Sequence, residues 1–291
     1  MIALSCAASA FAQPGAALAD LAQKSTLTAA DRETIRQKLR GWIEELKIAD
    51  SDRERARSRD QITQALAQGT NAFRAAASDV AAGELTALMR SKPVIAHDAV
   101  MILGELNQMG TAPALYDALQ SRLPAVRYQA ASAVKSLQPK MTAPGQYGPA
   151  ITALAGAAEK ETDRIVQRMI YQALDFTQDG SAFAGKDELA KALTRVLAVR
   201  LGQSSSAGVF NPNQHVPLYQ TVQRLAADLT DAPVRLVAHL AEIMKLFVER
   251  ARNGAIRRDA VAECESALHA LIDKFGGRSA DLPRLADLID R

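Results

Sequence analysis

Apolar residues recur at steps of three and four positions along most of the chain, and this is the period of an amphipathic α-helix. The first clear stripe consists of Ile35, Leu39, Trp42, Ile43 and Leu46. Polar and charged residues fill most of the positions between them. The pattern predicts a helix over residues 28–48 that turns one apolar face toward a core.

Start signals divide the periodic segments into separate helices. Thr28 is followed three residues later by Asp31, and Ser51 by Glu54, which is the spacing of a capping box. The same periodicity predicts further helices over residues 72–90, 93–108, 112–122, 124–137, 147–160, 163–176, 186–202, 214–230, 232–253, 256–275 and 281–290. Because β-branched and polar residues seldom alternate, we predict an all-α fold.

Two stretches with similar sequences lie 31 residues apart. They are Ile95 to Leu106 and Val126 to Leu137. Recurrence at a period of roughly 20 to 50 residues marks stacked supersecondary units, because each unit exposes an apolar face that only its neighbour can cover. The repeat predicts an α-solenoid of antiparallel helix pairs.

The helix that begins at Pro124 opens with Val126-Arg127 and continues with small and aliphatic residues on one face. Similar openings occur at Pro233 to Arg235 and at Ala255 to Arg257. These openings resemble the second helix of HEAT repeats, particularly the short HEAT-like, armadillo-type kind. The resemblance is good over residues 93–138. It implies a right-handed superhelix that binds partners on a continuous face, and it implies no reaction.

An arginine in the first turn of such a helix can bridge carbonyl groups or a carboxylate from the preceding turn or repeat, while its stem covers apolar surface. We therefore interpret Arg127 and Arg235 as structural residues. Loss of a charged hydrogen bond predicts that Arg127→Ala lowers the free energy of unfolding by about 1–3 kcal/mol.

The first twelve residues carry no charge and end in Ala10-Phe11-Ala12, a small-x-small pattern that signal peptidase accepts. We interpret residues 1–12 as a signal peptide, which predicts a periplasmic or secreted protein. An apolar N-terminal helix and a lipoprotein anchor at Cys6 are the alternatives. Residues 13–70 are predicted to form a helical cap and residues 71–291 the HEAT-like repeats. The apolar run is too short to span a bilayer.

The charges are nearly balanced, with 35 Lys and Arg residues against 32 Asp and Glu residues. The richest charged stretch, residues 31–60, interleaves arginines such as Arg53 and Arg57 with Asp52 and Glu54, so most of its field cancels locally. Neither the totals nor this stretch indicates a nucleic-acid partner.

Motifs for catalysis or for cofactors are weak. The segment Gly180 to Lys186 has the GxxxxGK spacing of a phosphate-binding loop, but Asp187 follows where a Ser or Thr would bind magnesium, and a helix precedes it. The pairs His239 with Glu242 and Glu265 with His269 reproduce no zinc or di-iron motif. No GxSxG or Cys-His signature occurs. We predict no cofactor, no metal and no catalysis.

The most irregular segment is residues 203–217, and connections longer than about 12–15 residues tend to be functional or disordered. If it is ordered, it offers a ligand an aromatic anchor and polar groups from Phe210, Asn211, Asn213 and His215. Disorder is the alternative interpretation. These four residues are the sequence's binding-site candidates.

These observations predict a protein-interaction module or scaffold whose partner is another protein. Two alternatives stay open. One is a lyase-like enzyme related to short HEAT-like proteins. The other is a binder of nucleic acid or of a membrane surface, which requires a continuous basic stripe such as Arg250, Arg252, Arg257 and Arg258.

Overall fold

The computed structural model describes residues 14–177, 184–207, 212–231, 233–251, 257–275 and 277. Contacts divide the chain into two compact units, Met1–Thr111 and Ala112–Arg291. The described residues of both units form helices and contain no strand. None of the described helices is both long and apolar enough to cross a bilayer.

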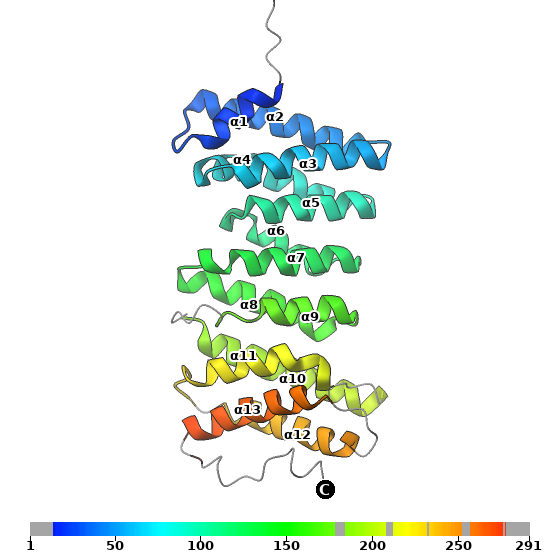
Figure 1. The fold of residues 1–291 in the computed structure, drawn as a ribbon, viewed down its shortest axis with the longest axis vertical. Coiled ribbons are helices and arrows are strands. Elements are labelled where there is room, and N and C mark those ends of the chain that lie inside the picture. Colours follow the sequence, from blue (N-terminus) through cyan, green and yellow to red (C-terminus); the bar gives the residue numbers. More distant parts are fainter. Residues whose placement is uncertain are drawn as a thin grey trace, which may run out of the picture. The chain divides into compact units, whose positions relative to one another are not determined.

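The first unit contains five α-helices and a short 3-10 helix within its described residues. They are α1 (Pro14–Gln23), α2 (Ala29–Ile48), α3 (Asp52–Gln68), α4 (Asn71–Leu88), α5 (Pro93–Leu106) and η1 (Met109–Thr111). Helices α2 and α4 pack side by side in one layer, and α1, α3 and α5 pack in a second layer against them. Figure 1 shows them in blue and cyan, with successive helices running back and forth.

Both predicted capping boxes are present, one at the start of α2 and one at the start of α3. The Thr28 hydroxyl accepts a hydrogen bond from the Asp31 amide at 3.2 Å, and the Asp31 carboxylate accepts one from the Thr28 amide at 2.9 Å. Ser51 and Glu54 repeat the arrangement at the start of α3. These bonds satisfy amides that have no partner inside the helix, so α2 and α3 begin within one residue of their caps.

The apolar stripes meet between the two layers of the first unit. Ile35 and Leu39 of α2, Ile62 of α3 and Leu85 of α4 are fully buried. One carboxylate is buried with them, because Asp98 of α5 has only 4% of its side chain exposed. It is neutralised from α3 by two arginines, as described below.

The second unit contains eight α-helices and two short 3-10 helices within its described residues. They are α6 (Ala112–Ala118), α7 (Pro124–Leu137), η2 (Gln138–Lys140), α8 (Pro144–Lys160), α9 (Arg164–Ala173), α10 (Lys186–Ala207), η3 (Pro212–His215), α11 (Val216–Ala226), α12 (Val234–Ala251) and α13 (Arg258–Lys274). Helices α6, α8, α10 and α12 form one layer, and α7, α9, α11 and α13 form the other. This unit extends from green to orange in Figure 1.

The predicted fold class is confirmed: the protein is all-α, and helix pairs stack in each unit as they do in an α-solenoid. Helix α6 ends at Ala118, earlier than predicted, because Leu123 precedes Pro124 and takes an extended conformation. The predicted helix over residues 281–290 lies outside the described residues. The cap over residues 13–70 and the repeats over residues 71–291 stay predictions.

The predicted irregular connection over residues 203–217 is wrong in extent. Helix α10 continues to Ala207, and η3 and α11 begin at Pro212 and Val216. The sequence suggested a loop because Ser204 to Ser206 are poor helix formers. Helix α10 as a whole packs against α8 and α12, which stabilises it although these serines favour helix only weakly.

Candidate functional site

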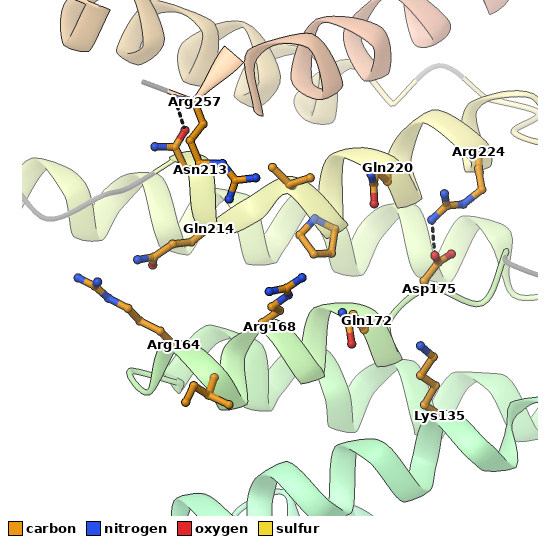
Figure 2. Close-up of a pocket in the computed structure, with 13 residues that line it drawn as sticks. Lys135, Arg164, Arg168, Gln172, Asp175, Asn213, Gln214, Gln220, Arg224 and Arg257 are labelled. Carbon is orange, nitrogen blue, oxygen red and sulfur yellow. Dashed lines mark hydrogen bonds and ion pairs between the residues drawn. The ribbon is translucent and has the colours of Figure 1, made fainter. Parts of the chain in front are cut away.

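A groove of about 730 Å³ opens in the second unit beside helix α9. Helices α7 and α9 supply one side, and η3, α11 and the residue before α13 supply the other. Its lining residues are mostly polar or cationic: Lys135, Arg164, Ile165, Arg168, Gln172, Asp175, Asn213, Gln214, Val216, Pro217, Gln220, Arg224 and Arg257. Figure 2 shows Arg164, Arg168 and Gln172 in a row along α9, with Gln214 and Gln220 on the opposite side.

Two of the cations in the groove are neutralised by the protein itself. Arg224 forms an ion pair with Asp175, which is nearly buried and also accepts a hydrogen bond from the Thr177 hydroxyl at 2.6 Å. Arg257 pairs with Asp259 through Nε at 3.0 Å. These two arginines are therefore held in place and carry little net field.

The other three cations, Lys135, Arg164 and Arg168, have no carboxylate within ion-pairing distance among the described residues. Arg164 and Arg168 are exposed, and Lys135 is half-buried. In Figure 2 the two arginines extend from α9 into the open space, and Lys135 reaches the same space from α7. The groove thus carries a local positive charge that nothing in the described part of the unit cancels.

The register of α9 explains why Arg168 faces the groove. Arg127 is the fourth residue of α7, and Gln167 is the fourth residue of α9. Gln167 is buried and its amide donates to the Glu161 carbonyl at 3.4 Å, so it occupies the inward position that Arg127 has in α7. Arg168 comes one residue later and points outward.

Arg127 acts as a clamp, because its inward-pointing side chain binds both the turn before α7 and the turn between α8 and α9. Its Nε and Nη2 donate to the two oxygens of Glu161 at 2.6 and 2.7 Å, and its Nη1 donates to the Ser121 carbonyl at 2.8 Å. The predicted carbonyl contact with the preceding turn is confirmed. The carboxylate partner, Glu161, comes instead from the turn between α8 and α9, which follows Arg127 in the chain.

Glu161 is charged although its side chain is only 1% exposed. Burial by itself would raise its pKa, but the hydrogen bonds from Arg127 and from the amides of Asp163 and Thr162 outweigh burial and lower the pKa below its ordinary value. The buried carboxylate is thus fully partnered, and among the described residues Arg127 is the only side chain that donates to it.

Comparison with protein families decides what these stacked helices are. The family model for HEAT repeats matches residues 84–175, which include Arg127, Arg164 and Arg168. This segment is similar to HEAT repeats. The predicted family is therefore confirmed on the residues that best carried the resemblance.

One solved structure shows the same kind of fold. A crystal structure of an engineered protein from the Northeast Structural Genomics Consortium is 16% identical, with a TM-score of 0.51, and the match covers 81% of this chain and 97% of that one. Human deoxyhypusine hydroxylase in complex with glycerol is 15% identical, with a TM-score of 0.28, over 82% of this chain and 97% of that chain. The first match concerns the fold alone, and the second is too weak to support a conclusion. No curated protein matches the chain at a significant level.

The binding residues proposed from the sequence are only partly brought to the groove. Phe210 and Asn211 lie outside the described residues. Asn213 lines the groove, and its side-chain oxygen accepts a hydrogen bond from the Arg257 amide at 3.2 Å. His215 does not line it: its side chain is buried, and its ring packs against Tyr171 with centroids 5.4 Å apart.

Burial also determines the charge of His215. Burial first, and the nearby Arg200 charge second, lower its pKa to about 3. The imidazole is therefore neutral at neutral pH and belongs to the core, so the described structure gives His215 no access to a docked ligand.

The metal and nucleotide candidates gain no support from the described structure. Among the described residues, no three His, Cys, Asp or Glu side chains gather closely enough to hold a metal ion, and these residues include His239, Glu242, Glu265 and His269. Lys186 is the first residue of α10. Among the described elements, α9 precedes α10, whereas a phosphate-binding loop needs a preceding strand. The Lys186 amine forms an ion pair with Asp228 at 3.5 Å.

Sequence reasoning missed the residues that define the groove. The prediction sought binding residues in the irregular segment 203–217, whereas Arg164, Arg168 and Gln172 lie on the regular helix α9. Their spacing of four residues was a usable signal, because it places them on one face of α9. Which carboxylates oppose that face could be read only from the packing of α9 against its neighbours.

A second hollow region lies in the first unit, around the half-buried Trp42. Its basic residues, Lys38 and Arg57, are accompanied by Glu45 and Glu54 in the adjoining hollow. Because charges of both signs surround Trp42, this region has no single complementary ligand charge. The groove beside α9 is therefore the better defined candidate site.

Proposed function

We propose that the protein is an exported, non-catalytic HEAT-repeat scaffold that binds a partner protein in the groove beside α9. The observation that carries this proposal is the set of three cationic side chains, Lys135, Arg164 and Arg168, that face the groove without a carboxylate among the described residues. Unneutralised charge on a concave surface favours an oppositely charged partner and speeds its association.

The surroundings of these cations support a protein partner. HEAT repeats usually mediate protein interactions. Ile165 is 72% exposed beside the groove, and the amides of Gln172 and Gln214 line it. A polar, concave surface with an exposed aliphatic residue suits a non-obligate protein interface, whose composition is mixed in this way.

The same lining gives no support to catalysis. In the described part of the lining, Asp175 is the one carboxylate and is neutralised by Arg224, and no His, Cys or Ser lies there that could act with it. General acid–base or nucleophilic catalysis needs such a pair within hydrogen-bonding reach. Export rests on the apolar, uncharged residues 1–12, which lie outside the described residues.

Site-specific photocrosslinking in intact cells tests this function. A photoreactive residue replaces Gln172 in the groove and, as a matched control, the exposed Lys191 on α10. We expect a protein adduct from position 172 in the envelope or secreted fraction and none from position 191. Mass spectrometry identifies the adduct and reads the mature N-terminus.

An identical adduct from both positions, or no adduct from position 172, would contradict docking in the groove. A chain that begins at Met1 and stays in the cytosolic fraction would contradict export. The two outcomes are independent, because binding and localisation are read from separate peptides.

A further inference from the structure

We infer that the groove beside α9 binds an extended acidic segment of its partner, with two carboxylates on alternate residues seated on Arg164 and Arg168. This inference rests on the proposed function and adds the chemistry of the ligand. Its evidence is the charge, spacing, size and hydrogen-bonding capacity of the groove.

The charge of the lining selects an anion. Lys135, Arg164 and Arg168 are available, whereas Arg224 and Arg257 already have carboxylate partners within the protein. A guanidinium group binds a carboxylate through two parallel N–H bonds, and such charge-assisted bonds are the strong ones. A ligand that supplies carboxylates would satisfy the groups that the described part of the unit leaves unpaired.

The spacing of the two arginines matches alternate side chains of an extended chain. Arg164 and Arg168 are four residues apart on α9, which corresponds to about 6 Å along the helix axis. In an extended chain, side chains on the same face are two residues apart, or about 6.6 Å. The sequence acidic-x-acidic therefore places one carboxylate on each arginine.

The size of the groove favours an extended segment over a helix. A helix is about 10–12 Å wide with its side chains, so three turns occupy well over about 1,000 Å³. The groove has about 730 Å³. A single extended strand is narrower than a helix and suits a groove of this size.

The amide side chains suit an exposed peptide backbone. An extended segment presents N–H donors and C=O acceptors that need partners. Gln172 and Gln214 each offer both a donor and an acceptor from opposite sides of the groove (Figure 2). Gln220 keeps its carbonyl oxygen available, because only its amide nitrogen is used, donating to Glu263 at 2.9 Å. Cations alone would attract an anion but could not accept backbone N–H groups.

A nucleic acid fits the lining less well, although it is also anionic. Single strands are held by stacking of bases on aromatic side chains in addition to phosphate contacts. Among the described residues, the lining contains no Phe, Tyr or Trp. Its apolar members, Ile165, Val216 and Pro217, suit instead an aliphatic side chain next to the acidic pair.

Peptide binding to the full chain tests the inference. A fluorescent peptide that contains Glu-Ser-Glu between Gly-Ser spacers is titrated with the protein and followed by anisotropy. The comparison probes are the same peptide with Gln-Ser-Gln, a stapled helical peptide with two Glu residues four positions apart, and an oligothymidylate. We expect the Glu-Ser-Glu peptide to bind most tightly and its affinity to fall as salt is raised.

Variants then assign the binding to the two arginines. Arg164→Ala/Arg168→Ala should weaken binding of the Glu-Ser-Glu peptide by about tenfold or more, given the usual cost of losing charged hydrogen bonds. Lys191→Ala/Arg235→Ala is the matched control, since it removes the same charge from exposed positions on α10 and α12. Its affinity should equal that of the unmodified protein, and thermal unfolding should show both variants folded.

The outcomes separate this inference from the proposed function. Equal binding of the Gln-Ser-Gln peptide, tighter binding of the helical peptide, or equal loss in both double variants would overturn the acidic extended ligand. Crosslinking at position 172 to a partner segment without acidic residues would do the same and leave the protein-binding function standing. Tighter binding of oligothymidylate, with no protein adduct at position 172, would overturn both.

Discussion

Helices α3 and α9 show why the number of arginines in a segment is a poor guide to a binding surface. Helix α3 carries Arg53, Arg55, Arg57 and Arg59, whereas α9 carries only Arg164 and Arg168. Yet carboxylates neutralise more of the arginine charge on α3 than on α9. The difference lies in the carboxylates that the fold places opposite each helix.

On α3, the inward arginines converge on one buried carboxylate. Asp98 accepts from Arg55 Nε at 2.9 Å and from Arg59 Nη1 at 3.2 Å, and its side chain is 4% exposed. Arg55 also pairs with Asp52, and Arg59 with Asp60. On α9, the corresponding inward residue is the neutral Gln167, and both arginines point outward. The proposed binding surface lies where the cations face away from the protein's own carboxylates.

The largest effect should come from breaking the tightest internal pair. Arg127→Ala leaves the Glu161 carboxylate buried with only backbone donors, and we expect the free energy of unfolding to fall by about 3 kcal/mol, toward the upper end of the sequence-based expectation. Chemical denaturation measures the change. Arg235 was interpreted from the sequence as structural, but that interpretation is wrong, because its side chain is exposed and forms no hydrogen bond or ion pair among the described residues. Arg235→Ala should therefore change stability by less than about 0.5 kcal/mol. Equal losses in the two variants would show that Arg127 is not a clamp.

A smaller effect should come from removing the carboxylate that neutralises α3. Asp98→Asn deprives Arg55 and Arg59 of their shared buried partner, but both keep an exposed aspartate, so we expect a loss of about 2 kcal/mol. Denaturation of the full chain measures it, with the exposed Asp79→Asn on α4 as the control. A loss no larger than that of the control would mean that Asp52 and Asp60, the carboxylates on α3 itself, are sufficient to neutralise Arg55 and Arg59.

The smallest effect should come from making α9 resemble α3. Gln172→Glu adds a carboxylate one turn beyond Arg168, and partial neutralisation should weaken binding of the acidic peptide by about threefold, as expected for an exposed ion pair. Anisotropy titration measures the change. Gln223→Glu adds the same charge at an exposed position of α11 outside the groove. Stronger weakening by Gln223→Glu than by Gln172→Glu would place the ligand elsewhere.

Much of the fold could be predicted because its signals are local. The capping boxes at Thr28 and Ser51 and the prolines at the starts of α5 and α7 act on the helices that contain them. The 31-residue register between Ile95 and Val126 reports a packing relation between neighbouring repeats that recurs in the sequence. Local bonding and repetition are both visible without coordinates.

The candidate site could not be predicted in the same way. Arg127 is the fourth residue of α7 and Arg168 the fifth residue of α9, and the sequence alone does not separate their roles. Their different fates depend on Glu161, which lies 34 residues beyond Arg127 and is buried by the turn into α9. His215 likewise was a candidate ligand-binding residue until its ring was found in the core against Tyr171.

The sequence by itself therefore determined that the protein is a stack of helix pairs, because helix period, caps and repeat length are properties of neighbouring residues. Only the tertiary structure decided which cations pair with the protein's own carboxylates and which face a groove. The physical reason is that Coulomb attraction depends on distance in space and on burial, and carboxylates such as Asp98 and Glu161 reach their arginines only after distant helices have packed.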